Sequence, residues 1–220
     1  SMAIIKKHDF VEIEYTARTK EDNAVFDTTD ADVAKNEGVY DKNNDYSPVV
    51  VCIGESSILK AVEESLVGKD TGKEYTFEIS AENAFGKKDA RLLQMIPLSK
   101  FRQQNIQPVP GLQLNIDGVF GIVKTVSGGR CYVDFNHPLS GRDLVYNVNV
   151  KRIVEDDREK LNSLLKIHLN SKDAETDIAE GRASVKLKHE VPKEAQGEFK
   201  KIVGRTIPSV KSIELVHIKS

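Results

Sequence analysis

The chain has 220 residues, of which 39% are hydrophobic and 30% are charged, and its formal net charge is −2. These values indicate a soluble protein of one or two domains with enough apolar residues for a core. A charge so near zero gives no strong global field, so neither nucleic acid nor a membrane is expected as a partner. No apolar run approaches 18 residues and no signal-peptide pattern is present, which predicts a cytoplasmic protein.

The N-terminal part predicts antiparallel strands. Residues 10–19 alternate apolar and polar with period two, as in a half-buried strand, and residues 25–26 begin a return strand. Residues 28–48 are rich in Asp, Asn, Lys and Tyr, which predicts a long loop. Residues 49–53 predict a buried strand, and alternation returns at residues 75–79.

One short helix is predicted between these strands. Ser56 or Ser57 is suited to cap its start, and Gly68 is suited to end it. Its apolar residues recur at helical spacing and are Ile58, Leu59, Val62 and Leu66.

Residues 87–135 have the pattern of a small folded unit inserted into the first. A short helix is expected from Ser99 to Asn105. Three strand-like runs follow, at 112–116, 119–126 and 130–135, and the dipeptides that join them, Asp117-Gly118 and Gly128-Gly129, are hairpin signals. About fifty residues make a small core, so the unit is expected to depend on its host.

Residues 155–220 predict a third unit of two helices and two strands. Its helices are expected around Leu161–Leu165 and from Pro192 to Gly204, and its strands around 183–187 and 213–218. Because these elements bury little by themselves, the unit is expected to dock on the host or to pair with a second copy of the chain.

The cysteines and histidines do not suggest a metal centre. Cys52 and Cys131 stand alone in apolar runs, which favours free buried thiols in a reducing compartment. The five histidines are scattered, so no metal site is expected.

A series of short motifs is more specific than any of these patterns. In chain order they are Val25-Phe26-Asp27-Thr28-Thr29, Ile53-Gly54-Glu55, Asn83-Ala84-Phe85-Gly86, Asn136-His137-Pro138-Leu139-Ser140-Gly141 and Leu144-Val145-Tyr146. Their order and spacing over residues 4–154 resemble the FKBP-type peptidyl-prolyl cis/trans isomerases. The Asn136–Gly141 motif after an insertion is similar to the SlyD-type branch, and the C-terminal extension is similar to its long archaeal members.

This resemblance implies an α+β fold, with a bent antiparallel sheet around one short helix at 57–67. It also implies an inserted, mostly β flap domain and a C-terminal α/β unit. The expected domains are an isomerase domain of residues 1–86 plus 136–154, a client-binding flap of residues 87–135, and a C-terminal domain of residues 155–220.

The resemblance also implies an apolar groove that binds proline and needs no cofactor or metal. Its catalytic residues would be Tyr15, Phe26, Asp27, Ile58, Leu59, Val62, Phe85 and Tyr146. Further substrate-binding residues would be Leu139 and Leu144, with Met95, Ile96, Phe101 and Phe120 on an exposed surface of the flap. Many members have tryptophan at the position of Val62 and tyrosine at that of Phe85.

Simpler interpretations stand beside these. Tyr15, Ile58, Leu59 and Val62 also fit an ordinary core, and Asp27 and His137 also fit turns. The expected function is an isomerase and chaperone whose partners are unfolded or partly folded polypeptides with X-Pro bonds, with a homodimer through the C-terminal domain as a possible assembly. The alternative is a holdase chaperone with little catalysis, which the lack of tryptophan and the presence of Phe85 motivate.

Overall fold

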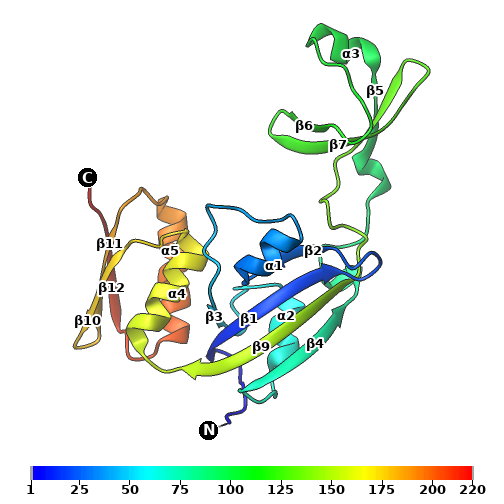
Figure 1. Ribbon diagram of the computed structural model, residues 1–220. Coiled ribbons are helices and arrows are strands. Elements are labelled where there is room, and N and C mark those ends of the chain that lie inside the picture. The colour runs from blue at the N-terminus through cyan, green and yellow to red at the C-terminus, as the bar shows by residue number, and fades with distance from the viewer. Residues whose placement is uncertain (1, 220) are drawn as a thin grey trace. The chain divides into compact units, whose positions relative to one another are not determined.

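The computed structural model describes residues 2–219, which divide into two compact units (Figure 1). The host unit comprises the chain up to Ile79 together with the chain from Asp143 onward, and the insert unit is Ser80–Arg142. By its contacts the C-terminal part therefore groups with the host, and the predicted three-domain boundaries stay a prediction. No helix among residues 2–219 is both long and apolar enough to cross a bilayer.

The host unit is built on a five-stranded antiparallel sheet, in agreement with the expected α+β class. Its order is β2-β1-β9-β4, and β3 also pairs with β1. The strands are β1 (Phe10–Thr19), β2 (Val25–Thr28), β3 (Val49–Cys52), β4 (Lys73–Ile79) and β9 (Leu144–Val154). The long strands β1 and β9 follow the period-two alternation of their sequences, which places one side of each in the core.

Two short helices belong to this sheet. Helix α2 (Lys60–Leu66) packs on β4, with Leu66 fully buried. It begins later than predicted because Leu59 occupies the N-cap, and the Ser57 hydroxyl instead accepts a hydrogen bond from the Cys52 amide. Helix α1 (Ala31–Asn36) lies inside the predicted loop, where the Asp30 carboxylate caps it. Only Ala34 of α1 is buried, so its sequence carries no apolar period.

The C-terminal part forms two helices on a three-stranded sheet of order β10-β11-β12. Both helices lie between that sheet and the larger one (Figure 1). Helix α5 continues two residues beyond Gly204, and strand β10 was not predicted. The elements are α4 (Asp157–Leu169), β10 (Glu175–Ala179), β11 (Arg182–Leu187), α5 (Lys193–Thr206) and β12 (Ser212–His217).

A shared core holds this part on the host sheet. Phe10 is the cross-strand neighbour of both Cys52 and Val154, and all three are buried in one cluster with Leu161 and Phe199 of the C-terminal helices. The expected docking on the host is therefore confirmed. Pairing with a second copy stays a prediction.

The insert unit is a four-stranded sheet of order β5-β8-β7-β6 with one short helix. Helix α3 starts after Pro97, not at Ser99, and the strand before it was not predicted. Phe101 is 5% exposed and packs with Val123, Cys131 and Val133, so the expectation that Phe101 lies on an exposed surface is wrong. The elements are β5 (Leu93–Pro97), α3 (Leu98–Gln103), β6 (Gln113–Ile116), β7 (Val119–Ser127) and β8 (Arg130–Asp134).

Candidate active site

Three aromatic rings from neighbouring strands meet on the host sheet. The ring centroids of Tyr15 and Tyr146 are 5.9 Å apart, and those of Phe26 and Tyr146 are 6.1 Å apart with the rings edge to face. The register explains the meeting, because Ala17 of β1 is opposite Tyr146 on β9 and opposite Asp27 on β2. Tyr15 and Phe26 are half-buried and Tyr146 is buried, so the cluster is apolar but reachable.

A hydrogen bond gives this cluster one polar end. The Tyr15 hydroxyl donates to Asp27 Oδ2 over 2.7 Å, and the Asp27 side chain is exposed. Burial, and then the charge of Asp27, raises the pKa of Tyr15, and the same two causes raise the pKa of Tyr146 to about 12. Both phenols therefore keep their protons at neutral pH. Neither is a base, and the arrangement is suited to binding and orientation.

The loop before α2, in the host unit, carries two further residues that were predicted for the site. Ile58 and Leu59 are half-buried there. Val62 on α2 and Leu144 on β9 are both 0% exposed. A substrate cannot touch either of these two side chains in this arrangement, so the direct contacts predicted for them are wrong.

Glu63 shapes that loop from within α2. Its carboxylate accepts the amide N–H groups of Gly54 and Ser56 at Oε1, over 2.9 and 3.2 Å, and that of Ile58 at Oε2, over 3.1 Å. Burial raises the pKa of Glu63, and the amide bonds oppose that rise. The buried Glu63 carboxylate therefore satisfies loop amide groups that would otherwise need water as a partner. The loop adopts left-handed backbone conformations at Gly54 and Ser56.

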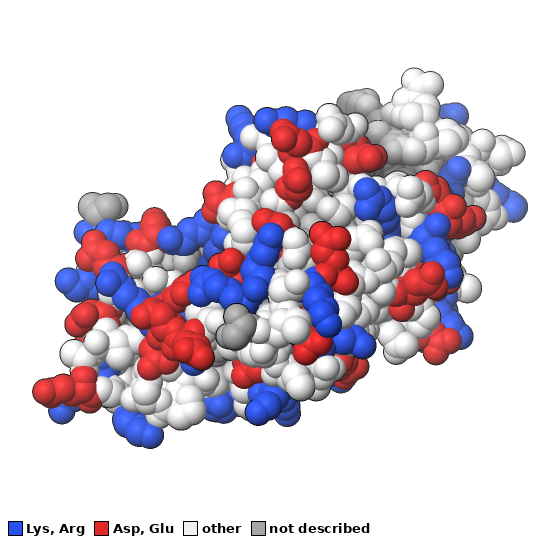
Figure 2. Space-filling view, turned by 60° about the horizontal axis from the view of Figure 1, so that its bottom comes forward, with Lys and Arg blue, Asp and Glu red and all other residues white. Residues whose placement is uncertain are grey.

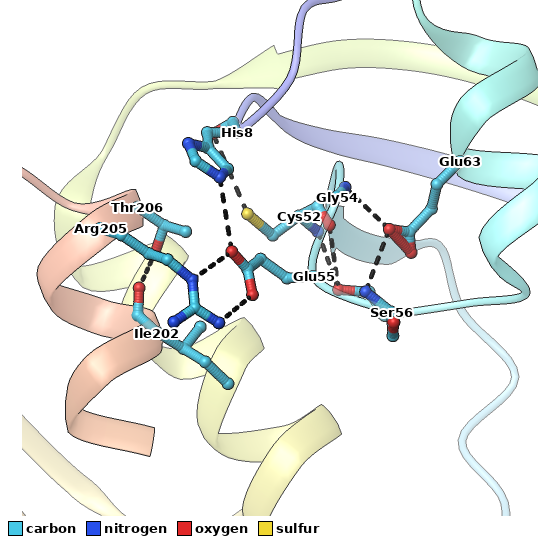
Figure 3. A network of polar contacts seen from close by, with 10 residues as sticks. His8, Cys52, Gly54, Glu55, Ser56, Glu63, Ile202, Arg205 and Thr206 are labelled. Carbon is cyan, nitrogen blue, oxygen red and sulfur yellow. Dashed lines mark hydrogen bonds and ion pairs between the residues drawn. The ribbon is translucent and has the colours of Figure 1, made fainter. Parts of the chain in front are cut away.

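An ion pair holds the same loop from the other side (Figure 3). Arg205 of α5 donates from Nε and from its second terminal nitrogen to the two oxygens of Glu55, each over 2.7 Å. His8 Nε2 lies 3.4 Å from Glu55 Oε1. Hydrogen bonding to Arg205 is the largest cause that lowers the pKa of Glu55. Sequence reasoning missed this pair, since its partners are 150 positions apart and no local pattern links them.

The two motifs that flank the insertion lie side by side within the insert unit. The Gly141 amide donates to the Gly86 carbonyl over 2.7 Å, and the Phe85 and His137 rings stack at 4.5 Å. The Leu139 amide donates to His137 Nδ1 over 3.0 Å, which supports the interpretation of His137 as a turn residue. Phe85 and Leu139 belong to the insert unit, and their expected contacts with substrate stay predictions.

The insert unit carries much of the exposed apolar surface. It holds nine of the fifteen large hydrophobic side chains that are exposed among the described residues. Met95 is 48% exposed and lies opposite the exposed Tyr132 on β8, and Phe120 is 39% exposed near the β6–β7 hairpin. Ile96, in contrast to the exposed Met95, is partly buried and packs against the insert core.

The host unit also has a cavity of about 690 Å³ beside Tyr15. Its lining is largely polar, with Glu14, Asp30, Asp32 and Glu74 among its residues. Such a surface suits a proline ring poorly, so we place the candidate site at the aromatic cluster. On the face drawn in Figure 2, acidic and basic side chains are interspersed.

Comparisons with known proteins decide the family. The family described as FKBP-type peptidyl-prolyl cis-trans isomerase matches residues 2–101, and the IF domain of FKBP26 matches residues 94–139. A short-type peptidyl-prolyl cis-trans isomerase of Methanocaldococcus jannaschii is 30% identical over 150 residues, which cover 68% of this chain and 94% of that protein. The chain belongs to the FKBP-type peptidyl-prolyl cis-trans isomerase family. As a member of this FKBP-type family it is an isomerase, and the resemblance drawn from the motifs is confirmed.

Two bacterial relatives support the FKBP assignment. A probable FKBP-type 16 kDa peptidyl-prolyl cis-trans isomerase of Pseudomonas fluorescens is 31% identical over 121 residues, covering 53% of this chain and 79% of that protein. The FKBP-type isomerase SlyD of Vibrio cholerae is 28% identical over 116 residues, covering 51% of this chain and 57% of that protein.

Proposed function

We propose that this FKBP-type protein isomerises X-Pro bonds of polypeptide clients at the cluster of Tyr15, Phe26 and Tyr146. The observation that supports the proposal is the meeting of these rings around the Tyr15–Asp27 hydrogen bond. Rotation of a peptide bond loses amide resonance and has a barrier of about 18–20 kcal/mol. X-Pro bonds are the ones with an appreciable cis population. No covalent bond breaks, so no nucleophile or metal is required.

The cluster is suited to lower that barrier by differential binding. A twisted amide is less polar than a planar one, so an apolar surface disfavours the ground state more than the transition state. In this mechanism Phe26 and Tyr146 contact the proline ring together with Ile58 and Leu59. Asp27, fixed by the Tyr15 hydroxyl, orients the polar atoms of the substrate.

The insert unit is the proposed client-capturing part. Strand β5 pairs only with β8 among the described residues, so its second edge has no strand partner, and an extended chain would pair there. The exposed side chains of Leu93, Met95 and Tyr132 lie along β5 and β8 and offer apolar contacts. Main-chain pairing with apolar contacts gives affinity that tolerates many client sequences.

Isomerase assays on a proline tetrapeptide and on a proline-limited refolding protein test the proposal. Phe26→Ala is expected to lower kcat/KM on both substrates by roughly tenfold or more, since a lost ring contact costs about 1.4 kcal/mol or more of transition-state binding. A control for lost apolar surface is Val216→Ala, at an exposed position of β12. A folded wild-type protein that accelerates neither reaction would contradict the proposal.

A holdase with little catalysis is the second candidate. The exposed apolar surface of the insert and the lack of tryptophan in the chain favour it. Suppression of client aggregation without any proline-dependent rate enhancement would select this function. We also keep a cytoplasmic location, supported by the two free buried cysteines, and a homodimer through residues 155–220 as proposals. Light scattering of the full chain tests the dimer.

A further inference from the structure

We propose that a groove between strand β3 and helix α4 binds an extended stretch of client chain next to the prolyl bond. The proposal rests on the proposed isomerase function and deepens it, because it assigns to residues 155–220 a part in client recognition.

The groove is continuous with the candidate site. It has a volume of about 480 Å³, and both Tyr15 and Ile58 are part of its lining. Tyr15 belongs to the aromatic cluster, and Ile58 to the loop before α2. A chain whose proline lies at the cluster therefore has a path into the groove. The volume is within the range of ordinary ligand sites.

One wall of the groove is the edge of a β-strand. The consecutive residues Val49, Val50 and Val51 all line it, although side chains of successive strand residues point to opposite faces. Three residues in a row line one cavity only when the strand presents its edge. Strand β3 pairs with β1 and with no other strand among residues 2–219, so this edge has no strand partner.

The other wall comes from the C-terminal part. Asn162, Ser163 and Lys166 of α4 line the groove, and so does Ser171 just beyond the helix. The Ser171 side chain is buried, and its hydroxyl has no hydrogen-bond partner among the described residues. A buried hydroxyl without a partner is uncommon in folded proteins, and it marks this wall as able to accept a polar group.

These features fit an extended polypeptide better than a compact small molecule. At Cys52 this strand is already bonded to the Ser57 hydroxyl, so the main-chain groups that an extended peptide matches, by adding as a further strand, are those of Val49–Val51. Such pairing recognises main-chain groups and not side chains, which suits a chaperone that binds many different clients. The groove thus supplies contacts that only substrates longer than the prolyl dipeptide can use.

Filling the groove tests the inference. Ser163→Phe adds a ring to the α4 wall, and the native Ser163 hydroxyl bonds only to the carbonyl of Lys160 in its own helix among the described residues. We expect kcat/KM for a proline-centred peptide of about ten residues to fall by roughly tenfold relative to the tetrapeptide, the effect of one or two lost main-chain hydrogen bonds. Lys200→Phe adds the same ring to an exposed position of α5 outside the groove and should leave the ratio unchanged.

A second measurement uses the unchanged full chain. In amide NMR spectra, titration with the ten-residue peptide should shift Val49–Val51, whereas the tetrapeptide should shift only residues around Tyr15. Equal loss on both peptides in Ser163→Phe, or no shift of Val49–Val51, would overturn the inference. Lack of activity of the wild type on the tetrapeptide would instead overturn the proposed function, so the two failures are distinguishable.

Discussion

Arg205 and Glu55 form a two-point ion pair, with both nitrogen–oxygen distances at 2.7 Å, that joins helix α5 to the loop before α2. Glu55 is almost buried, with its side chain 6% exposed, and Arg205 is 47% exposed. That loop leads directly to Ile58 and Leu59 of the candidate site. The C-terminal part is thus linked to the site by a specific contact as well as by the shared core.

Removal of the arginine is expected to weaken this link. Arg205→Ala removes both guanidinium hydrogen bonds from the buried Glu55 carboxylate and should cost about 2 kcal/mol of unfolding free energy, because the exposure of Arg205 reduces the full penalty of a buried pair. Arg205→Lys keeps the positive charge but cannot make the two-point contact of the guanidinium. Its free energy of unfolding should therefore lie between those of Arg205→Ala and the wild type. Urea unfolding measures both. Equal stability of Arg205→Ala and wild type would contradict the importance of the pair.

Glu63 is expected to contribute more to stability and to kcat/KM than the adjacent Glu64. Glu63→Gln removes the charge that accepts three loop amides, and should cost about 1–3 kcal/mol and lower kcat/KM through the displaced Ile58. Glu64→Gln is the matched control, as Glu64 is exposed and pairs only with Lys60 among the described residues. Thermal unfolding and the tetrapeptide assay give the two readouts. Similar losses in both variants would refute a specific role for Glu63.

Acid is expected to destabilise the host unit through His168. Burial lowers the pKa of His168, and its Nε2 has no partner among the described residues. A histidine whose folded pKa is depressed binds more protons when unfolded, so stability is lost as the pH falls through its unfolded pKa of about 6.5. His168→Gln should therefore show a smaller loss of stability between pH 7 and pH 5 than wild type. Parallel unfolding curves for the two proteins over that range would exclude this contribution.

We expect client binding and the stability of the insert unit to depend on different side chains. Met95→Ser should reduce suppression of client aggregation with less than about 0.5 kcal/mol change in stability, because Met95 is exposed. Phe101→Ala should destabilise the insert by about 3–5 kcal/mol, because Phe101 is buried in its core. Val216→Ser, at an exposed site of the host unit, is the control for lost apolar surface. Aggregation assays measure client binding by the three variants, and denaturant unfolding measures their stability.

Local patterns were sufficient for much of the fold. The alternation of residues 10–19 predicted β1, and the runs at 112–116 and 119–126 with their Asp117-Gly118 turn predicted β6 and β7. The short elements α1, β5 and β10 were missed because each has few buried residues, so neither period is visible in its sequence.

The residues predicted for the candidate site likewise fall into two groups in the structure. Tyr15, Phe26, Asp27 and Tyr146 were predicted from the family resemblance, and the pairing register brings them together. The motifs also suggested contact through Val62 and Leu144, but both are fully buried. Spacing predicts which face of an element a residue occupies, whereas the depth of that residue depends on what packs over the face.

The sequence by itself determined the family and most of the strands, since these follow from short-range spacing and motifs. Only the tertiary structure decided that Arg205 reaches Glu55 and that α4 stands opposite the edge of β3. The physical reason is that such contacts join positions more than a hundred residues apart. Their geometry depends on how the C-terminal helices pack on Phe10, Cys52 and Val154, which no local pattern records.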